Sequence, residues 1–282
     1  MNRRAFLIQS VAFALVGSAP LAAIAQPPRR PRFEPTRFSV RVEGSGPDVI
    51  LIPGLTSSRS IWRRAVEAVP GYRYHLLQVA GFAGEPARGN ADGPVVRPLA
   101  AEIARYIESR GLSRPAVIGH SMGGTIGLML AAQRPDLVGR LMVVDMTPQP
   151  TALYGGAAAS QLAQGLQSMV GSREGRQLLS SIVSAFSPPA PAERNSDPDV
   201  VARAMHDLGT INLTADLPRL RAPLTVVYAA PNPETRASVQ RAFADAYRGA
   251  RGARLVRIDE SGHMIMADQP ARFAREMRDF LR

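Results

Sequence analysis

Short runs of apolar residues alternate along this chain with longer segments whose apolar positions recur every three or four residues. The short runs predict strands, over 38–43, 49–52, 72–79, 116–118, 141–144, 224–228 and 255–258. The longer segments predict helices, over 61–69 with Ser60 as N-cap, 95–110, 125–133, 235–247 and 270–281. Apolar strands that alternate with helices indicate an α/β fold with a mostly parallel, doubly wound sheet, in which the 38–43 strand forms an edge.

Between residues 148 and 212 this alternation stops. The segment is helical in pattern, rich in Leu, Met and Ile, and has a Pro-rich break at 187–191. We expect an inserted helical cap over the strand ends, so that the core comprises residues 37–147 and 213–282. A pair of ordinary surface helices is the simpler alternative.

The first 25 residues have the pattern of an export signal. Paired arginines at positions 3 and 4 precede an apolar stretch over 11–16, and small residues end the segment at Ala25. The Arg-Arg-x-Phe-Leu order resembles a twin-arginine signal, with Asn2 where Ser or Thr is more usual. Because the apolar stretch is short for a membrane span, we expect cleavage, no span thereafter, and a periplasmic or secreted protein. Retention as an anchor is the alternative, and residues 26–36 are expected to form a flexible N-terminus.

The formal net charge of +11 is carried entirely by arginine, because the chain contains no lysine. The arginines are scattered singly or in pairs and accompany no nucleic-acid motif, so we expect no nucleic-acid partner. The absence of cysteine excludes disulfides, thiolate catalysis and cysteine metal sites. No residues at metal-ligand spacing and no dinucleotide-binding glycine loop are found, so neither a metal nor a cofactor is expected.

The strongest chemical signal is Gly-His-Ser-Met-Gly-Gly at 119–124, between a predicted strand and a predicted helix. A G-x-S-x-G sequence at such a turn is typical of a nucleophile elbow, which presents a serine hydroxyl out of the sheet. Ser121 is therefore the candidate nucleophile. Ligands of parallel sheets bind beyond the carboxyl ends of the strands. Ser121, Asp145 and His263 each follow a predicted strand, so we expect them at one edge of the sheet.

A serine nucleophile needs a base to accept its proton. Of the four histidines, His263 follows a glycine in the loop after the last predicted strand, which makes it the candidate base. His75 lies within a predicted strand and is expected to be structural. His206 lies in the predicted cap, and His120 is expected to pack beside the nucleophile.

From about residue 38 to its C-terminus the sequence resembles the α/β-hydrolase superfamily. The resemblance rests on Pro53-Gly54, the 119–124 elbow, the strand that ends at Asp145, and Ser-Gly-His at 261–263 followed by Asp-Gln-Pro at 268–270. It implies that the backbone N–H groups of Leu55 and Met122 form an oxyanion hole. Relatives often have His-Gly where this chain has Pro-Gly, but a backbone donor does not need that histidine.

The acid of the implied triad stays open. Most relatives carry it in a turn after the strand that corresponds to 224–228, where this chain has Asn232 in place of Asp. Glu234, two residues later, is one alternative. Some relatives place the acid after the strand that follows the nucleophile helix, and Asp145 stands there; we favour Asp145.

These features predict a cofactor-independent serine hydrolase that cleaves an ester, lactone or thioester of a small molecule through an acyl-enzyme. Two alternatives remain at this stage. One is acyl transfer or cofactor-free peroxidase-like activity at the same site. The other is a non-catalytic periplasmic binding protein of this fold, which the departure at Asn232 favours.

Overall fold

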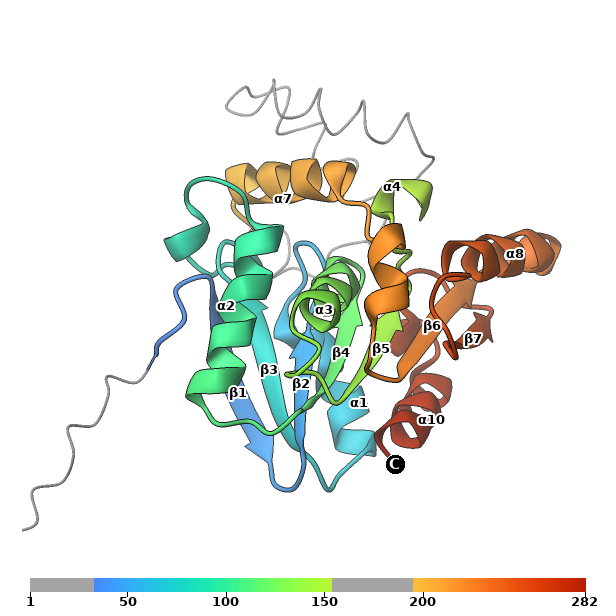
Figure 1. Ribbon diagram of the computed structural model, residues 1–282, viewed down its shortest axis with the longest axis horizontal. Coiled ribbons are helices and arrows are strands. Elements are labelled where there is room, and N and C mark those ends of the chain that lie inside the picture. Colours follow the sequence, from blue (N-terminus) through green and yellow to red (C-terminus); the bar gives the residue numbers. More distant parts are fainter. Residues whose placement is uncertain (1–32, 154–194) are drawn as a thin grey trace, which may run out of the picture. The chain divides into compact units, whose positions relative to one another are not determined.

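The computed structural model describes residues 33–153 and 195–282 (Figure 1). The predicted export signal (1–25), the first part of the predicted flexible N-terminus (26–32) and most of the predicted cap (154–194) lie outside the described residues. Within the described part, no helix is long and apolar enough to cross a membrane.

A seven-stranded sheet forms the centre of the described part, in the order β1-β3-β2-β4-β5-β6-β7. Its strands are β1 (Phe38–Gly44), β2 (Asp48–Ile52), β3 (Arg73–Val79), β4 (Ala116–His120), β5 (Arg140–Val144), β6 (Leu224–Ala230) and β7 (Arg254–Asp259). Edge strand β1 is antiparallel to β3, and the other neighbours are parallel. The predicted fold class, including the edge position of the first strand, is confirmed.

Helices cover both faces of this sheet (Figure 1). The helices are α1 (Arg63–Ala68), α2 (Val96–Ser109), α3 (Met122–Gln133), α4 (Pro150–Leu153), α7 (Pro198–Thr210), α8 (Arg236–Ala246), α9 (Ile265–Asp268) and α10 (Pro270–Leu281). Short 3-10 turns add η1 (Arg59–Trp62), η2 (Arg88–Asn90), η4 (Thr214–Arg219) and η5 (Pro233–Thr235). One apolar cluster joins α2, α3, α7 and α8 to the sheet, and a second joins α1, α9 and α10 to the opposite face.

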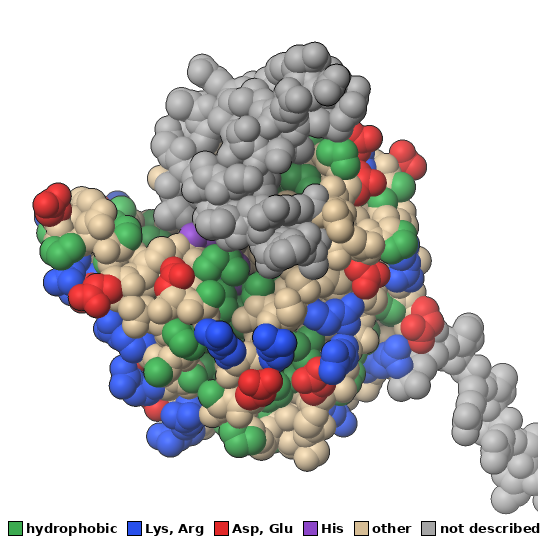
Figure 2. Space-filling model, turned by 180° about the vertical axis from the view of Figure 1, so that it is seen from behind, with side chains coloured by type: hydrophobic (Ala, Val, Ile, Leu, Met, Phe, Trp, Pro, Cys, Tyr) green, Lys and Arg blue, Asp and Glu red, His purple; other side chains and the backbone are tan. Residues whose placement is uncertain are grey.

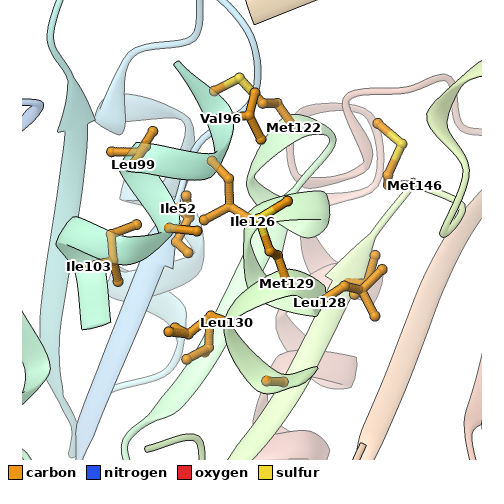
Figure 3. Close-up of a cluster of buried hydrophobic side chains, with 14 of the residues drawn as sticks. Ile52, Val96, Leu99, Ile103, Met122, Ile126, Leu128, Met129, Leu130 and Met146 are labelled. Carbon is orange, nitrogen blue, oxygen red and sulfur yellow. The ribbon is translucent and has the colours of Figure 1, made fainter. Parts of the chain in front are cut away.

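The central strands are apolar on both faces because each face is covered. Alternate residues of β2, β4 and β5 enter the first cluster, namely Ile50, Ile52, Val117, Leu141 and Val143. The residues between them enter the second, namely Val49, Leu51, Ile118, Met142 and Val144. Figure 3 shows the first cluster, with Ile126 and Met129 of α3 beside Leu99 and Ile103 of α2. This two-sided burial explains the continuous apolar runs of the sequence.

The predicted helix over 61–69 begins differently from our expectation. The chain enters it through the 3-10 turn η1, and the side chain of Ser58 accepts a hydrogen bond from the N–H of Ser60 at 3.2 Å. The prediction of Ser60 as N-cap is therefore wrong. In the 3-10 turn, the side chain of the N-cap Ser58 accepts from the backbone N–H two residues later. Ser60 is therefore the donor of this hydrogen bond and not the capping residue.

Helix α7 falls within the predicted cap segment and packs on the core. The Asp207 carboxylate accepts hydrogen bonds from the N–H groups of Val95 and Val96, at 2.7 and 2.9 Å, where α2 begins. Arg203 donates to the carbonyls of Asn90 and Ala91, both at 2.8 Å. These bonds satisfy otherwise open donors at a helix start and attach α7 to the 90–96 loop.

His75 lies in β3 among buried polar groups, as expected for a structural histidine. Its Nε2 lies 2.8 Å from a carboxylate oxygen of Asp48, which can only accept, so Nε2 carries the proton. The Nδ1 atom then accepts from the Tyr106 hydroxyl at 2.8 Å. Burial lowers the pKa of His75 below its usual value of 6.5, although the Asp48 carboxylate opposes that shift.

Candidate active site

Ser121 occupies a strained turn between β4 and α3. Its backbone has φ 53° and ψ −121°, a conformation that non-glycine residues rarely adopt. The turn requires glycine on both sides of Ser121, because nearby backbone atoms leave no room for a side chain at either position. A Cβ on Gly119 would lie 2.1 Å from the Gly123 carbonyl oxygen, and one on Gly123 would lie 2.2 Å from the Ile52 carbonyl oxygen. The sequence pattern therefore forms the elbow that it predicted.

Asp145 and His263 meet at the same edge of the sheet, after β5 and β7. The Oδ2 atom of Asp145 lies 2.7 Å from Nδ1 of His263. The Oδ1 atom of Asp145 accepts a hydrogen bond from the N–H of Ala229 at 2.9 Å. Because the carboxylate only accepts, Nδ1 carries a proton, and a neutral ring then has its lone pair on Nε2. A general base for Ser121 needs that tautomer.

The two alternative acids lie elsewhere. Asn232 and Glu234 are both exposed after β6, where Asn232 is the N-cap of the 3-10 turn η5 and Glu234 lies within it. The single proton on Nδ1 of His263 has its acceptor in Asp145. The structure therefore brings Asp145 to the candidate base, and neither Asn232 nor Glu234.

The loop that carries His263 is held from α9 and the residue after it. The N–H of Gly262 donates to the Asp268 carboxylate at 2.9 Å, and the Gln269 side-chain amide donates to the Glu260 carbonyl at 2.9 Å. In the sequence, Asp-Gln-Pro at 268–270 indicated only the family resemblance, and this supporting role was missed. The signal available was its spacing, five residues after the histidine.

Of the two predicted oxyanion donors, Met122 directly follows Ser121, and Leu55 lies in a loop that approaches it. Met122 is the first residue of α3, so its N–H has no intrahelical acceptor and lies at the positive end of the helix. Leu55 follows β2 in a turn closed by the Ser57 N–H, which donates to the Gly54 carbonyl at 3.2 Å. A Cβ on Gly54 would lie 3.1 Å from the Ser121 Cβ, so this loop approaches the elbow closely.

His120 is buried beside the candidate nucleophile, as predicted, and also contacts the candidate base, which sequence reasoning missed. It is 1% exposed. Its Nε2 lies 2.9 Å from the His263 carbonyl oxygen, and the two rings are 4.6 Å apart. Burial, and secondarily the neighbouring His263, lowers the pKa of His120 from 6.5 to about 3. His120 is therefore uncharged at neutral pH.

The pKa of His120 predicts a loss of stability in mild acid. Below pH 6.5 the unfolded chain takes up a proton on this histidine, whereas the folded protein does so only near pH 3. The free energy of unfolding should therefore fall by about 2 kcal/mol between pH 7 and pH 5 from His120 alone. His75 adds a contribution of the same sign, because its folded-state pKa is also lowered. Urea unfolding at the two pH values measures the change.

The matched control is His120→Gln, which cannot titrate and should lose less stability over the same interval. His75 remains in that variant, so a smaller loss should persist. Equal unfolding free energies at pH 7 and pH 5 in the wild-type protein would contradict the assignment of buried, neutral histidines.

Charged groups of both signs are mixed on the face drawn in Figure 2. Arginine side chains lie there among aspartates and glutamates. Within residues 33–153 and 195–282, no group of three or more His, Asp or Glu side chains is placed to hold a metal ion.

Comparisons with known proteins agree with this fold. The sequence model of the alpha/beta hydrolase family matches residues 49–276. The chain is 25% identical over 212 residues to the pimeloyl-[acyl-carrier protein] methyl ester esterase of Vibrio atlanticus (strain LGP32). This alignment covers 66% of this chain and 77% of that esterase.

Solved structures show the same fold at lower identity. A thermophilic esterase from Thermogutta terrifontis has a TM-score of 0.70 and 21% identity, over 86% of this chain and 92% of that one. The enol-lactonase from Burkholderia xenovorans LB400 has a TM-score of 0.65 and 19% identity, over 87% and 96% of the two chains. The chain belongs to the α/β-hydrolase family. It is an enzyme of the hydrolase class.

Proposed function

We propose that the protein is a serine hydrolase that cleaves a carboxylic ester, lactone or thioester of a small molecule through an acyl-enzyme. The observation that carries this proposal is the 2.7 Å contact between Asp145 and Nδ1 of His263, at the same edge of the sheet as the Ser121 elbow. A nucleophile, a carboxylate and a base, in this order along the chain, match the arrangement typical of the fold.

Each residue has a separate task in the proposed reaction. Ser121 Oγ attacks the substrate carbonyl while Nε2 of His263 accepts its proton, and Asp145 stabilises the imidazolium that forms. The N–H groups of Leu55 and Met122 stabilise the oxyanion of the tetrahedral intermediate. His263 then gives its proton to the leaving group, and the acyl-enzyme forms. Water, activated by His263 in the same way, releases the acyl group and restores Ser121.

The relatives support the substrate class. The Vibrio atlanticus and Thermogutta terrifontis proteins are named as esterases, and the Burkholderia xenovorans protein is named as an enol-lactonase. All three names describe attack on an acyl carbonyl that bears an oxygen leaving group. Such chemistry needs only the serine, base, acid and oxyanion donors assigned above.

The contact to Asp145 also bears on the non-catalytic alternative. That alternative drew its support from Asn232, which stands where many relatives have their acid. A carboxylate already bound to Nδ1 of His263 removes this reason, because the base does not depend on position 232. The proposal therefore favours an enzyme over a binding protein that merely retains the fold.

A fluorophosphonate probe followed by peptide mass spectrometry tests the proposal. The reagent should label Ser121, and labelling should disappear after brief preincubation with a paraoxon-type inhibitor. A panel of p-nitrophenyl esters of increasing acyl length, together with simple lactones, should show turnover. A folded protein that takes no label and cleaves no member of the panel would overturn the proposal. Product that forms only when an alcohol acceptor is added would indicate acyl transfer instead.

A further inference from the structure

The imidazole of His120 joins the elbow to the loop of the candidate base. The atom that accepts from its Nε2 is the His263 carbonyl oxygen, at 2.9 Å. A carbonyl oxygen cannot donate, so Nε2 of His120 carries the proton and the ring is a donor at that atom. This hydrogen bond connects residues that are 143 positions apart in the chain.

The bond holds a different part of the loop from the two contacts made by α9 and Gln269. Asp268 holds the N–H of Gly262, and Gln269 holds the carbonyl of Glu260, both before the histidine. His120 holds the carbonyl of His263 itself. Rotation of that peptide group would turn the Cα–Cβ bond and displace the imidazole from its acid and its nucleophile.

Packing alone does not account for a histidine at position 120. The Nδ1 atom of the ring is buried against Gly54, whose hypothetical Cβ would lie 2.9 Å away, and it has no hydrogen-bond partner among the residues that the structure describes. A buried polar atom without a hydrogen bond lowers the stability of the folded protein. An apolar ring of similar size would avoid this cost, so the polar ring has a task at Nε2.

The neutral state of His120 suits this position. During the proposed reaction His263 becomes an imidazolium, with its ring 4.6 Å from that of His120. A second positive charge there would oppose proton transfer from Ser121. Burial keeps the pKa of His120 at about 3, so the ring donates a hydrogen bond without carrying a charge at working pH.

We propose that His120 is a positioning residue for the catalytic base: its Nε2–H holds the His263 backbone so that the imidazole stays between Asp145 and Ser121. The inference rests on the proposed function, because it assigns His120 a task in that reaction. A displacement of about 1 Å in a catalytic group can lower the rate about 100-fold. Loss of the bond should therefore act on kcat, and KM should change little because His120 is buried beneath the elbow.

The test compares His120→Gln, His120→Asn and His120→Phe in the full-length chain, with p-nitrophenyl butyrate as substrate. The Gln amide nitrogen reaches the ε position of the histidine ring, whereas the Asn amide reaches only the δ position. The Asn and Phe variants should lose about 10- to 100-fold in kcat with KM within about threefold, and the Gln variant should stay within about fivefold of wild type. Labelling rates with the fluorophosphonate probe should follow the same order.

Urea unfolding of each variant separates positioning from stability. Retention of wild-type kcat by all three variants would overturn the inference, as would equal losses in the Gln and Asn variants. If His120→Phe does not fold, the Gln and Asn pair decides, since both are polar and differ only in reach. A wild-type protein that neither labels nor cleaves would overturn the proposed function and the inference together. An active wild type with unchanged variants would overturn the inference alone.

Discussion

Replacing Asp145 by asparagine is expected to lower kcat by about 10⁴-fold, because the base then takes the wrong tautomer. Asparagine can keep the hydrogen bond that Oδ1 of Asp145 accepts from the Ala229 N–H. Its amide group would donate toward Nδ1 of His263, so the ring proton would move to Nε2. That atom could no longer accept the proton of Ser121. The charge that stabilises the imidazolium would also be lost.

Glu234→Gln and Asn232→Asp are the matched controls for this variant. Both residues are exposed at the η5 turn; Glu234→Gln removes one negative charge and Asn232→Asp adds one. Their kcat values should stay within about threefold of wild type, since surface changes away from the site have small effects. Steady-state kinetics on one p-nitrophenyl ester suffices for all three. Near-normal turnover in Asp145→Asn, or a large loss in Glu234→Gln, would show that the acid is misassigned.

Ser121→Ala should abolish acyl-enzyme formation and lower kcat by about 10⁶-fold, because the elbow then carries no hydroxyl group to attack the substrate. The fluorophosphonate probe should no longer label the protein. His263 and Asp145 should keep their contact, since the substitution removes a single oxygen atom. Turnover that survives in this variant would contradict the assignment of Ser121.

Ser121→Gly makes a second measurement at the same position. The backbone there has φ 53°, which glycine adopts without the steric cost that serine and alanine share. The glycine variant should be equally inactive but more stable than the alanine variant, by about 1 kcal/mol in urea unfolding. Equal stabilities would show that the elbow stores little strain. The expected difference would show that the fold gives up stability to present the hydroxyl group.

Local patterns were enough to predict most of the fold. The 3.6-residue periodicity predicted the helix over 95–110, and the structure buries one face of α2, including Leu99, Ile103 and Ile107. Continuous apolar runs predicted the strands, because a strand covered on both faces is apolar at every position. Helix starts were less accurate. Helix α3 begins at Met122, three residues before the predicted start, because the elbow turns directly into the helix.

The sequence alone also indicated Ser121 and His263, since each lies in a short motif beside a predicted strand. It supplied every candidate for the acid and favoured Asp145, but no local pattern could show which of them contacts His263. The export signal and the 154–194 part of the cap are still predictions from sequence.

Only the tertiary structure decided which groups meet. Asp145 and His263 are 118 residues apart, and His120 and the His263 carbonyl are 143 apart, so no local pattern could relate them. Parallel strands β4, β5 and β7 bring their carboxyl ends to one edge of the sheet, and the loops beyond them set the final distances. Residue types and periodicity determine local conformation, whereas hydrogen bonds between distant loops depend on how the whole sheet is assembled.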